Sequence, residues 1–208
     1  MKTEEKIDRF TYEKNLWSQG FQHILGLDEV GRGCLAGSVV VAGVIFPVDY
    51  HNDLLKDSKQ LSEKQRDELF YQIKEDAVSW TIKEGSLELI EQKNILWASL
   101  ITMHEIAQEN KPSPDFLLID GNRFVPSLIP HQCIIKGDDK SASIAAASIL
   151  AKVYRDDLMK ALHEEYPEYN WASNVGYATK DHYKGLAEFG ITKYHRRLFN
   201  LKTDKIRE

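Results

Sequence analysis

Four acidic residues follow three apolar, strand-like runs of the chain, each beside a glycine. Asp28 and Glu29 lie in ILGLDEVG, Asp120 follows FLLI, and Asp138 follows CIIKG. Because functional groups in α/β sheets gather at strand ends, we expect these carboxylates to converge. A single aspartate after a strand is commonly a turn former, but the recurrence at three strand ends favours a shared site.

Convergence of these carboxylates would carry an electrostatic cost. Each like-charged pair costs roughly 4 kcal/mol at about 4 Å and an effective dielectric constant of about 20. Either some of the carboxyls are protonated or divalent cations lie among them. A set of oxygen ligands without cysteine or histidine favours Mg²⁺ or Mn²⁺ over zinc. Two such ions would activate a water and stabilise the leaving oxygen of a phosphodiester, as in nucleases and polymerases.

Asp28 and Glu29 are adjacent, and neighbouring residues of a regular strand point to opposite faces. We therefore expect the strand to end or to bulge at these residues. Gly31 and Gly33, directly downstream, make such a departure plausible.

The glycines continue to Gly37, in a G-x-G-x-x-x-G spacing that is one residue too long for the dinucleotide-binding fingerprint. A strand-like run also follows where that motif requires a helix. Glycine permits close approach of the backbone to a substrate, with Arg32 available for a phosphate. On spacing alone, a plain tight turn is an equally good interpretation.

Apolar periodicity predicts the elements that would position these residues. The predicted helices cover residues 4–18, 63–77, 87–109, 143–165, 180–188 and 193–199. The predicted strands cover residues 23–27, 39–46, 78–84, 116–119 and 132–136. This alternation indicates an α/β fold with a mixed five-stranded sheet, since the first two strands are too close for a helical crossover and must pair antiparallel. Small residues in 143–165 predict a helix that packs very closely on the sheet or on a ligand.

Composition places the chain among ordinary globular proteins. Its 208 residues are 42% apolar and 28% charged, which excludes a disordered, fibrous or membrane-spanning protein. The net charge of −5 argues against binding of nucleic acid through bulk positive charge. Residues 176–208, however, carry eight basic and four acidic residues, a charge of +4, which leaves −9 for the rest. This asymmetry indicates either a polyanion partner at the C-terminal end or a solvated basic helix.

The two cysteines, Cys34 and Cys133, have no zinc-type spacing, and we interpret them as reduced core residues. The tryptophans (Trp17, Trp80, Trp97 and Trp171) are likewise interpreted as core residues. The charged N-terminus does not resemble a signal peptide, and the longest apolar runs have about eight residues. We expect a cytoplasmic protein without a membrane partner.

Five segments, taken together and in this order, resemble the ribonuclease HII family. They are GLDEVGRGCLAG at 26–37, KDSKQLS at 56–62, IDGN at 119–122, KGDDKSASIAAASILAKVYRD at 136–156 and GYATKDHYKGLAEFGITKYHRRLF at 176–199. The resemblance implies a ribonuclease H-like catalytic domain over residues 1–175. It also implies a basic C-terminal helical segment, residues 176–208, that completes the substrate groove.

The activity implied is endonucleolytic cleavage of the RNA strand of RNA–DNA hybrids, and nicking 5′ of single ribonucleotides embedded in duplex DNA. The expected products carry 5′-phosphate and 3′-hydroxyl ends. By position, Asp28, Glu29, Asp120 and Asp138 match the catalytic acids of the family, which bind Mn²⁺ or Mg²⁺. Two ions are expected during catalysis.

The resemblance also implies substrate-binding residues. Gly31, Arg32 and Gly33 match a GRG motif that recognises the 2′-hydroxyl of the ribonucleotide and neighbouring phosphates. Tyr177 matches a tyrosine that stacks on the following deoxyribose. Cys34 and Ser38 occupy positions where proline is common in the family, and we expect a slightly softer loop as a result.

Lys59, Ser148 and Lys152 are expected to touch backbone phosphates or the 5′ side of the scissile bond. The alternative is that the alanines before Ser148 are helix packing and that Lys152 is solvated. We interpret His182 and His195, in the basic segment, as structural rather than as proton shuttles.

Two other functions remain open on the sequence: a non-catalytic module that binds RNA–DNA hybrids, and a metal-dependent phosphatase of small phosphoesters. The sister ribonuclease HIII has an added N-terminal domain and lacks this GRG motif, which argues against that enzyme. A monomer is the default expectation. Recruitment by a sliding clamp or another replication or repair partner is left open.

Overall fold

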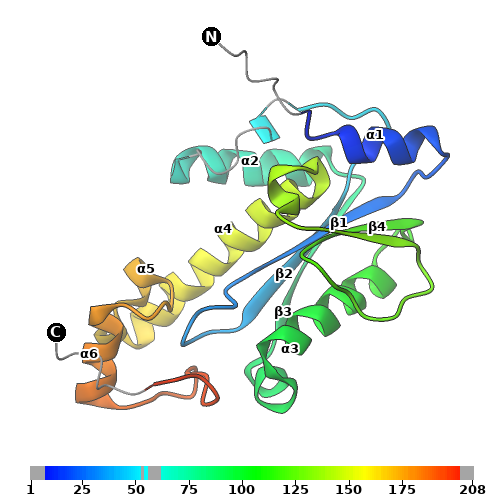
Figure 1. The fold of residues 1–208 in the computed structure, drawn as a ribbon. Helices are drawn as coiled ribbons and strands as arrows, with labels where there is room; N and C mark the ends of the chain where they lie inside the picture. The colour runs from blue at the N-terminus through cyan, green and yellow to red at the C-terminus, as the bar shows by residue number, and fades with distance from the viewer. Residues whose placement is uncertain (1–7, 53, 56–61, 202–208) are drawn as a thin grey trace, which may run out of the picture.

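The computed structural model describes residues 8–52, 54–55 and 62–201. A five-stranded sheet runs through the middle of the molecule (Figure 1). Its strands are β1 (Ile24–Val30), β2 (Val39–Ile45), β3 (Ser79–Gly85), β4 (Phe116–Asp120) and β5 (His131–Ile134). The longer helices are α1 (Thr11–Ser18), α2 (Glu63–Asp76), α3 (Leu87–Glu109), α4 (Ala142–Glu165) and α6 (Lys180–Phe189).

The strand order is β3-β2-β1-β4-β5. Strand β1 pairs antiparallel with β2, and β2 pairs antiparallel with β3. On its other side β1 is parallel to β4, which is parallel to β5. The mixed five-stranded sheet predicted from the sequence is thus confirmed, and the parallel pair β1 and β4 brings two of the acidic segments side by side.

Helices cover both faces of the sheet (Figure 1). On one face, apolar residues of α2 and α4 pack against Val40, Ala42 and Val44 of β2. On the other face, α3 packs against Leu25 and Leu27 of β1 and against β4. Consecutive residues of β1 and β2 therefore face different cores, because successive side chains of a strand point to opposite faces.

Helix α4 lies against the backbone of β1. A Cβ atom on Gly26 would lie 2.3 Å from the carbonyl carbon of Ser143, so only glycine fits at that position. The alanines at 145–147 are fully buried on this helix. The small residues predicted to allow close packing on a sheet or a ligand are therefore used for packing on the sheet.

Strand β1 corrects one expectation. Asp28 and Glu29 lie inside the strand, opposite Ala42 and Val41 of β2, and the pairing continues without a bulge to Val30. The hydrogen bonds of the ladder carry the strand past both acids. The chain leaves the sheet only at Gly31, which has a φ of +95°.

The C-terminal segment corrects a second expectation. Residues 193–199 form turns and an isolated β-bridge between Ala36 and His195, not a helix. The backbone here bonds to the loop after β1, because Gly37 N–H donates to Tyr194 O and Arg196 N–H donates to Leu35 O. These tertiary bonds replace the helical ones, which single-sequence periodicity does not register.

Smaller differences concern other parts of the chain. Helix α1 begins at Thr11, and residues 4–7 of the longer predicted helix lie outside the described residues. Two short helices, Pro167–Tyr169 and α5 (Trp171–Asn174), were not predicted. The side chains of Trp80 and Trp97 are exposed, so their interpretation as core residues is wrong, whereas Trp171 is fully buried. Both cysteines are free. In the described part of the chain, no helix has the length and apolar character needed to cross a membrane.

Candidate active site

Asp28 and Glu29 point to opposite faces of the sheet from neighbouring positions in β1. Asp28 lies on the face covered by α4, where the hydroxyl of Ser148 is close enough to lower its pKa. Glu29 lies on the face covered by α3, beside Ser99. The regular alternation of the strand therefore separates the two carboxylates, as expected for an unbroken strand.

Asp120 at the end of β4 connects them. Ile119 is the last residue of β4 that pairs with β1, opposite Leu27, so Asp120 lies level with the two acids of β1. The negative charge of Asp120 acts on both Asp28 and Glu29 and raises the pKa of each. Asp120, at the end of β4, therefore lies within electrostatic range of both acids of β1.

Asp138 lies in a short 3₁₀ turn, Gly137–Asp139, that follows β5 and contacts Asp120 through Gly137. The backbone N–H of Gly137 donates a hydrogen bond to Asp120 Oδ1 over 2.6 Å. This bond fixes the carboxylate of Asp120 and ties the turn that carries Asp138 to the end of β4.

The surroundings of Asp28 and Glu29 disfavour the charged form of their carboxyl groups. Asp28 is only 5% exposed, and burial raises its pKa well above the ordinary value, with further contributions from Glu29 and Asp120. Burial also raises the pKa of Glu29, against the effect of the nearby Arg32 guanidinium. The groups that act most strongly on Asp28 include two carboxylates and no basic side chain. A bound cation would relieve this desolvation and repulsion.

The candidate donor atoms suit a divalent cation. All candidate donors are carboxylate oxygens, which Mg²⁺ and Mn²⁺ prefer. Among the described residues, however, no three aspartate, glutamate, histidine or cysteine side chains already form a complete ligand group. Mg²⁺ is commonly held by one or two carboxylates together with water and substrate phosphates, so an incomplete protein set still fits this ion.

The GRG loop begins directly after β1 and packs on Arg155 of α4. A Cβ atom on Gly31 would lie 2.1 Å from Arg155 Nε, and the positive φ of Gly31 also disfavours any other residue. Gly33 is exposed, and a Cβ atom there would lie 3.6 Å from Tyr177 Cε1. Arg32 Nη1 donates to Glu29 Oε1 over 2.9 Å. The loop, Tyr177 and the acids of β1 thus lie next to one another.

The other three residues predicted to contact the substrate differ in how close they lie to the acids. Ser148 lies beside Asp28, and Lys152, one helical turn further along α4, forms an ion pair of 2.6 Å with Asp156. Lys59 lies outside the described residues. The structure therefore brings Ser148 to the acids, while Lys152 is held by its own helix.

His182 and His195 are buried, as their structural interpretation predicts. Trp171 Nε1 donates to His182 Nε2 over 3.1 Å, and the two histidine Nε2 atoms are also 3.1 Å apart. His182 Nδ1 then carries the proton and donates to the backbone oxygen of Tyr177 over 2.9 Å. The pair fixes the backbone at Tyr177.

Sequence reasoning missed this role of His182 and the two arginines under the GRG loop, Arg155 and Arg196. Both arginines lie in segments that carry the family resemblance, in VYRD and YHRR. An arginine beside a candidate site can indicate a buried supporting charge, but nothing in the sequence spacing distinguishes a buried guanidinium from a solvated one.

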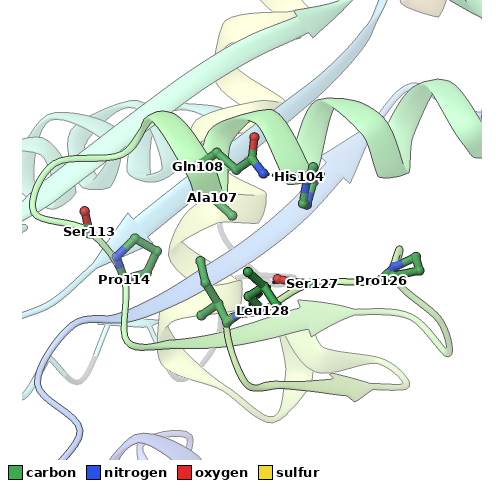
Figure 2. A pocket seen from close by; sticks show the side chains of 9 residues that line it. His104, Ala107, Gln108, Ser113, Pro114, Pro126, Ser127 and Leu128 are labelled. Atoms are coloured by element: carbon green, nitrogen blue, oxygen red, sulfur yellow. Dashed lines mark hydrogen bonds between the residues drawn. The ribbon is translucent and has the colours of Figure 1, made fainter.

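A separate hollow lies between α3 and the segments that flank β4 (Figure 2). His104 and Gln108 of α3 line it together with Pro114 and Leu128, and none of the predicted site residues does. The carboxylate group at β1 and β4 is therefore the better candidate for chemistry.

A mixed five-stranded sheet with carboxylates near the ends of two adjacent parallel strands is the arrangement expected of a nuclease of the ribonuclease H class. Comparison with known proteins agrees. The family model of ribonuclease HII matches residues 25–202. Ribonuclease HII of Bacteroides thetaiotaomicron is 56% identical over 181 residues, which cover 86% of this chain and 90% of the relative.

Two solved structures share the fold. RNase HII of Archaeoglobus fulgidus, solved as a complex with PCNA, is 26% identical, with a TM-score of 0.73 over 86% of this chain and 96% of that one. Bst-RNase HIII in complex with Mn²⁺ is 17% identical, with a TM-score of 0.63 over 86% of this chain and 68% of that one. The chain belongs to the ribonuclease HII family. It is an endoribonuclease of a family that depends on divalent metal ions.

Proposed function

We propose that this enzyme cleaves the RNA strand of RNA–DNA hybrids and nicks duplex DNA on the 5′ side of a single embedded ribonucleotide. The products are 5′-phosphate and 3′-hydroxyl ends. The observation that carries the proposal is the juxtaposition of Asp28, Glu29 and Asp120 with the GRG loop and Tyr177. Groups suited to cations and groups suited to a ribose thus share one surface.

In this proposal Asp28, Glu29, Asp120 and Asp138 hold two divalent cations, Mg²⁺ or Mn²⁺. Bound there, such ions supply an activated water and stabilise the leaving oxygen of the phosphodiester. The chain itself orients the ligands: Gly137 N–H holds Asp120, and Ser148 supports Asp28. The Mn²⁺ bound to the similarly folded Bst-RNase HIII supports the choice of ion.

Substrate recognition is assigned to Gly31, Arg32, Gly33 and Tyr177. An exposed glycine backbone allows the 2′-hydroxyl of a ribonucleotide to approach closely, and the half-exposed ring of Tyr177 offers a surface for the next sugar. Lys59, Ser148 and Lys152 contact phosphates or the 5′ side. Lys152 must leave Asp156 to do so.

Residues 1–175 form the catalytic domain in this proposal, and residues 176–208 complete the groove. The backbone hydrogen bonds of Tyr194 and Arg196 with the loop after β1 support a shared groove, because they hold the basic segment beside the GRG loop. A sliding clamp is proposed as a partner on the strength of the PCNA complex of the Archaeoglobus fulgidus relative.

A nicking assay tests the proposed activity against its alternatives. The full-length protein is incubated with Mg²⁺, with Mn²⁺ or with EDTA, on a duplex with one ribonucleotide, the same duplex in DNA alone, and p-nitrophenyl phosphate. We expect metal-dependent nicking of the first substrate only. Binding without nicking would support a non-catalytic module, and turnover of the chromogenic ester would support a phosphatase.

A further inference from the structure

Two arginines are buried beneath the GRG loop without an acidic partner. Arg155 of α4 and Arg196 of the C-terminal segment are each 0% exposed. No carboxylate of the described residues forms an ion pair with either of them. Buried charges are normally paired, because an isolated charge in a protein interior is costly. This pair of positive charges therefore needs an explanation.

Arg155 binds three backbone carbonyls of the surrounding loops. Its Nε donates to Ser38 O over 3.2 Å, Nη1 to Val175 O over 2.8 Å and Nη2 to Ala36 O over 3.1 Å. Carbonyl dipoles satisfy the donors of the guanidinium, but they leave its net charge in place.

Arg196 is satisfied less completely. Its Nε donates to Gly37 O over 2.9 Å and Nη1 to Arg32 O over 3.0 Å, whereas Nη2 is buried without a hydrogen-bond partner. Burial lowers the pKa of Arg196 to about 10, and the charge of Arg155 contributes to the lowering. At neutral pH the guanidinium of Arg196 is nevertheless charged.

The bond from Arg196 to Arg32 O also orients an exposed peptide. In a trans peptide the C=O and the following N–H point in opposite directions. Because Arg32 O points inward to Arg196, the N–H of Gly33 points away from the interior, at an exposed position of the loop. An outward N–H above a buried positive charge is an arrangement that binds anions.

The other ionisable groups near Arg196 do not neutralise this charge. Burial raises the pKa of both Cys34 and Tyr177, so both stay protonated at neutral pH. The guanidinium of Arg32, at the surface of the loop, is paired with Glu29. The positive charge of the two buried arginines is thus left for a ligand.

We propose that Arg196, supported by Arg155, is a positioning residue that makes the Arg32–Gly33 peptide a binding site for a backbone phosphate of the substrate. Arg196 does not touch the phosphate. It turns Gly33 N–H outward and supplies a positive charge one peptide layer below. This inference rests on the proposed function, since it names how that substrate is held.

The first test compares Arg196→Gln with Arg197→Gln, a control that removes the same formal charge from the next residue. The Arg197 side chain is 69% exposed and lies 3.9 Å from Glu91. KM and kcat are measured with Mg²⁺ on the single-ribonucleotide duplex at a series of KCl concentrations. For Arg196→Gln we expect KM to rise about tenfold and the slope of log KM against log [KCl] to fall by about one. For Arg197→Gln we expect a smaller rise in KM than for Arg196→Gln, because the exposed Arg197 side chain lies beside Glu91 and not beneath the loop.

The second test uses Arg196→Lys, which keeps the positive charge and an aliphatic stem. This variant still tests the role of the charge if Arg196→Gln does not fold. A buried lysine has a lowered pKa, so the introduced amine should lose its proton between about pH 7 and 9. Arg155 from α4, Cys34 from the loop, Tyr177 and the ring of Phe199 face this position. Burial raises the pKa of Cys34 and of Tyr177 above their ordinary values, which favours the neutral form of both over this range. The ratio of the KM of Arg196→Lys to that of the wild type should rise about tenfold from pH 6.5 to 9.5, if one charge contributes about 1.4 kcal/mol.

The outcomes separate this inference from the proposed function. A wild-type protein that does not nick the duplex would contradict the proposed function. A wild-type protein that nicks, with an unchanged KM in Arg196→Gln or a pH-independent ratio for Arg196→Lys, would overturn the role of Arg196 alone. A merely structural arginine would lower thermal stability without changing the salt slope or the pH profile of KM.

Discussion

The ring of Tyr177 lies against Gly33, with a distance of 3.6 Å from Tyr177 Cε1 to the place where a Cβ atom on Gly33 would lie. The contact joins the GRG loop to the start of the C-terminal segment. The backbone that would read a ribose and the ring that would contact the next sugar therefore form one surface. His182, which donates to Tyr177 O, holds the second half of it.

This contact predicts a selective effect of Tyr177→Ala. Loss of an aromatic stacking surface costs about 1–3 kcal/mol, so kcat/KM on the single-ribonucleotide duplex should fall roughly tenfold or more. Tyr177→Phe, which keeps the ring, should stay within about threefold of the wild type. Steady-state kinetics on this duplex and on a long RNA–DNA hybrid provide the check. An equal loss on both substrates would contradict a role at the ribose-to-deoxyribose junction.

The glycines of the loop should differ sharply in their tolerance of alanine. Gly31→Ala combines a positive φ with a Cβ atom 2.1 Å from the immobile Arg155, so we expect a loss of stability of about 2 kcal/mol or more. Gly33→Ala meets no clash, so its Tm should match that of the wild type while its kcat/KM falls, because the methyl group obstructs the sugar. Thermal unfolding and kinetics measure the two effects. A stable Gly31→Ala variant would argue against the described packing on Arg155.

Asp120→Asn should abolish cleavage without harming the fold. The asparagine oxygen can still accept the hydrogen bond from Gly137, and removal of one charge relieves repulsion on Asp28 and Glu29. We therefore expect activity to fall by about a thousandfold or more with an unchanged or slightly raised Tm, since a cation ligand is lost. Asp157→Asn, an exposed substitution on α4, serves as the control and should retain activity. Full activity of Asp120→Asn would remove this residue from the proposed metal site.

The buried histidine pair predicts a pH dependence of stability. Burial, with a contribution from His182, lowers the pKa of His195 to about 4, below its ordinary value of 6.5. The folded state binds this proton less readily than the unfolded state, so the contribution of His195 is present above about pH 6.5 and is lost as the pH falls toward 4. This loss amounts to at most about 3 kcal/mol.

Urea unfolding of the wild type and of His195→Gln at pH 7.0 and 4.5 measures this term. Glutamine can still donate to His182 but does not titrate, so the wild type should lose more stability than the variant on acidification. Equal losses in the two proteins would show that His195 is not the group responsible.

The sequence predicted most of the sheet, because strands and helices with strong apolar periodicity follow local rules. The capping box of α2 is present, with Ser62 and Gln65 bonded reciprocally. The path of β1 was not predictable in the same way. Whether a strand continues past Asp28 and Glu29 depends on its hydrogen bonds to β2, and these come from residues that lie later in the chain.

The residues that hold the site in place could not be predicted from the sequence either. Arg155 and Arg196 contact carbonyls of residues far away in the chain, and residues 193–199 adopt turns because they bond to the loop after β1. Such tertiary bonds override local propensity. The sequence therefore identified the groups proposed for chemistry, while the structure shows the residues that hold them.

The most direct test of the central claim is the position of the nick on a duplex that contains one ribonucleotide. The strand is labelled at either end, incubated with the protein and Mg²⁺ or Mn²⁺, and its products are compared with synthetic markers of defined ends. We expect a single cut on the 5′ side of the ribonucleotide, with a 3′-hydroxyl on one product and a 5′-phosphate on the other. A cut on the 3′ side, or a 2′,3′-cyclic phosphate end, would contradict this expectation.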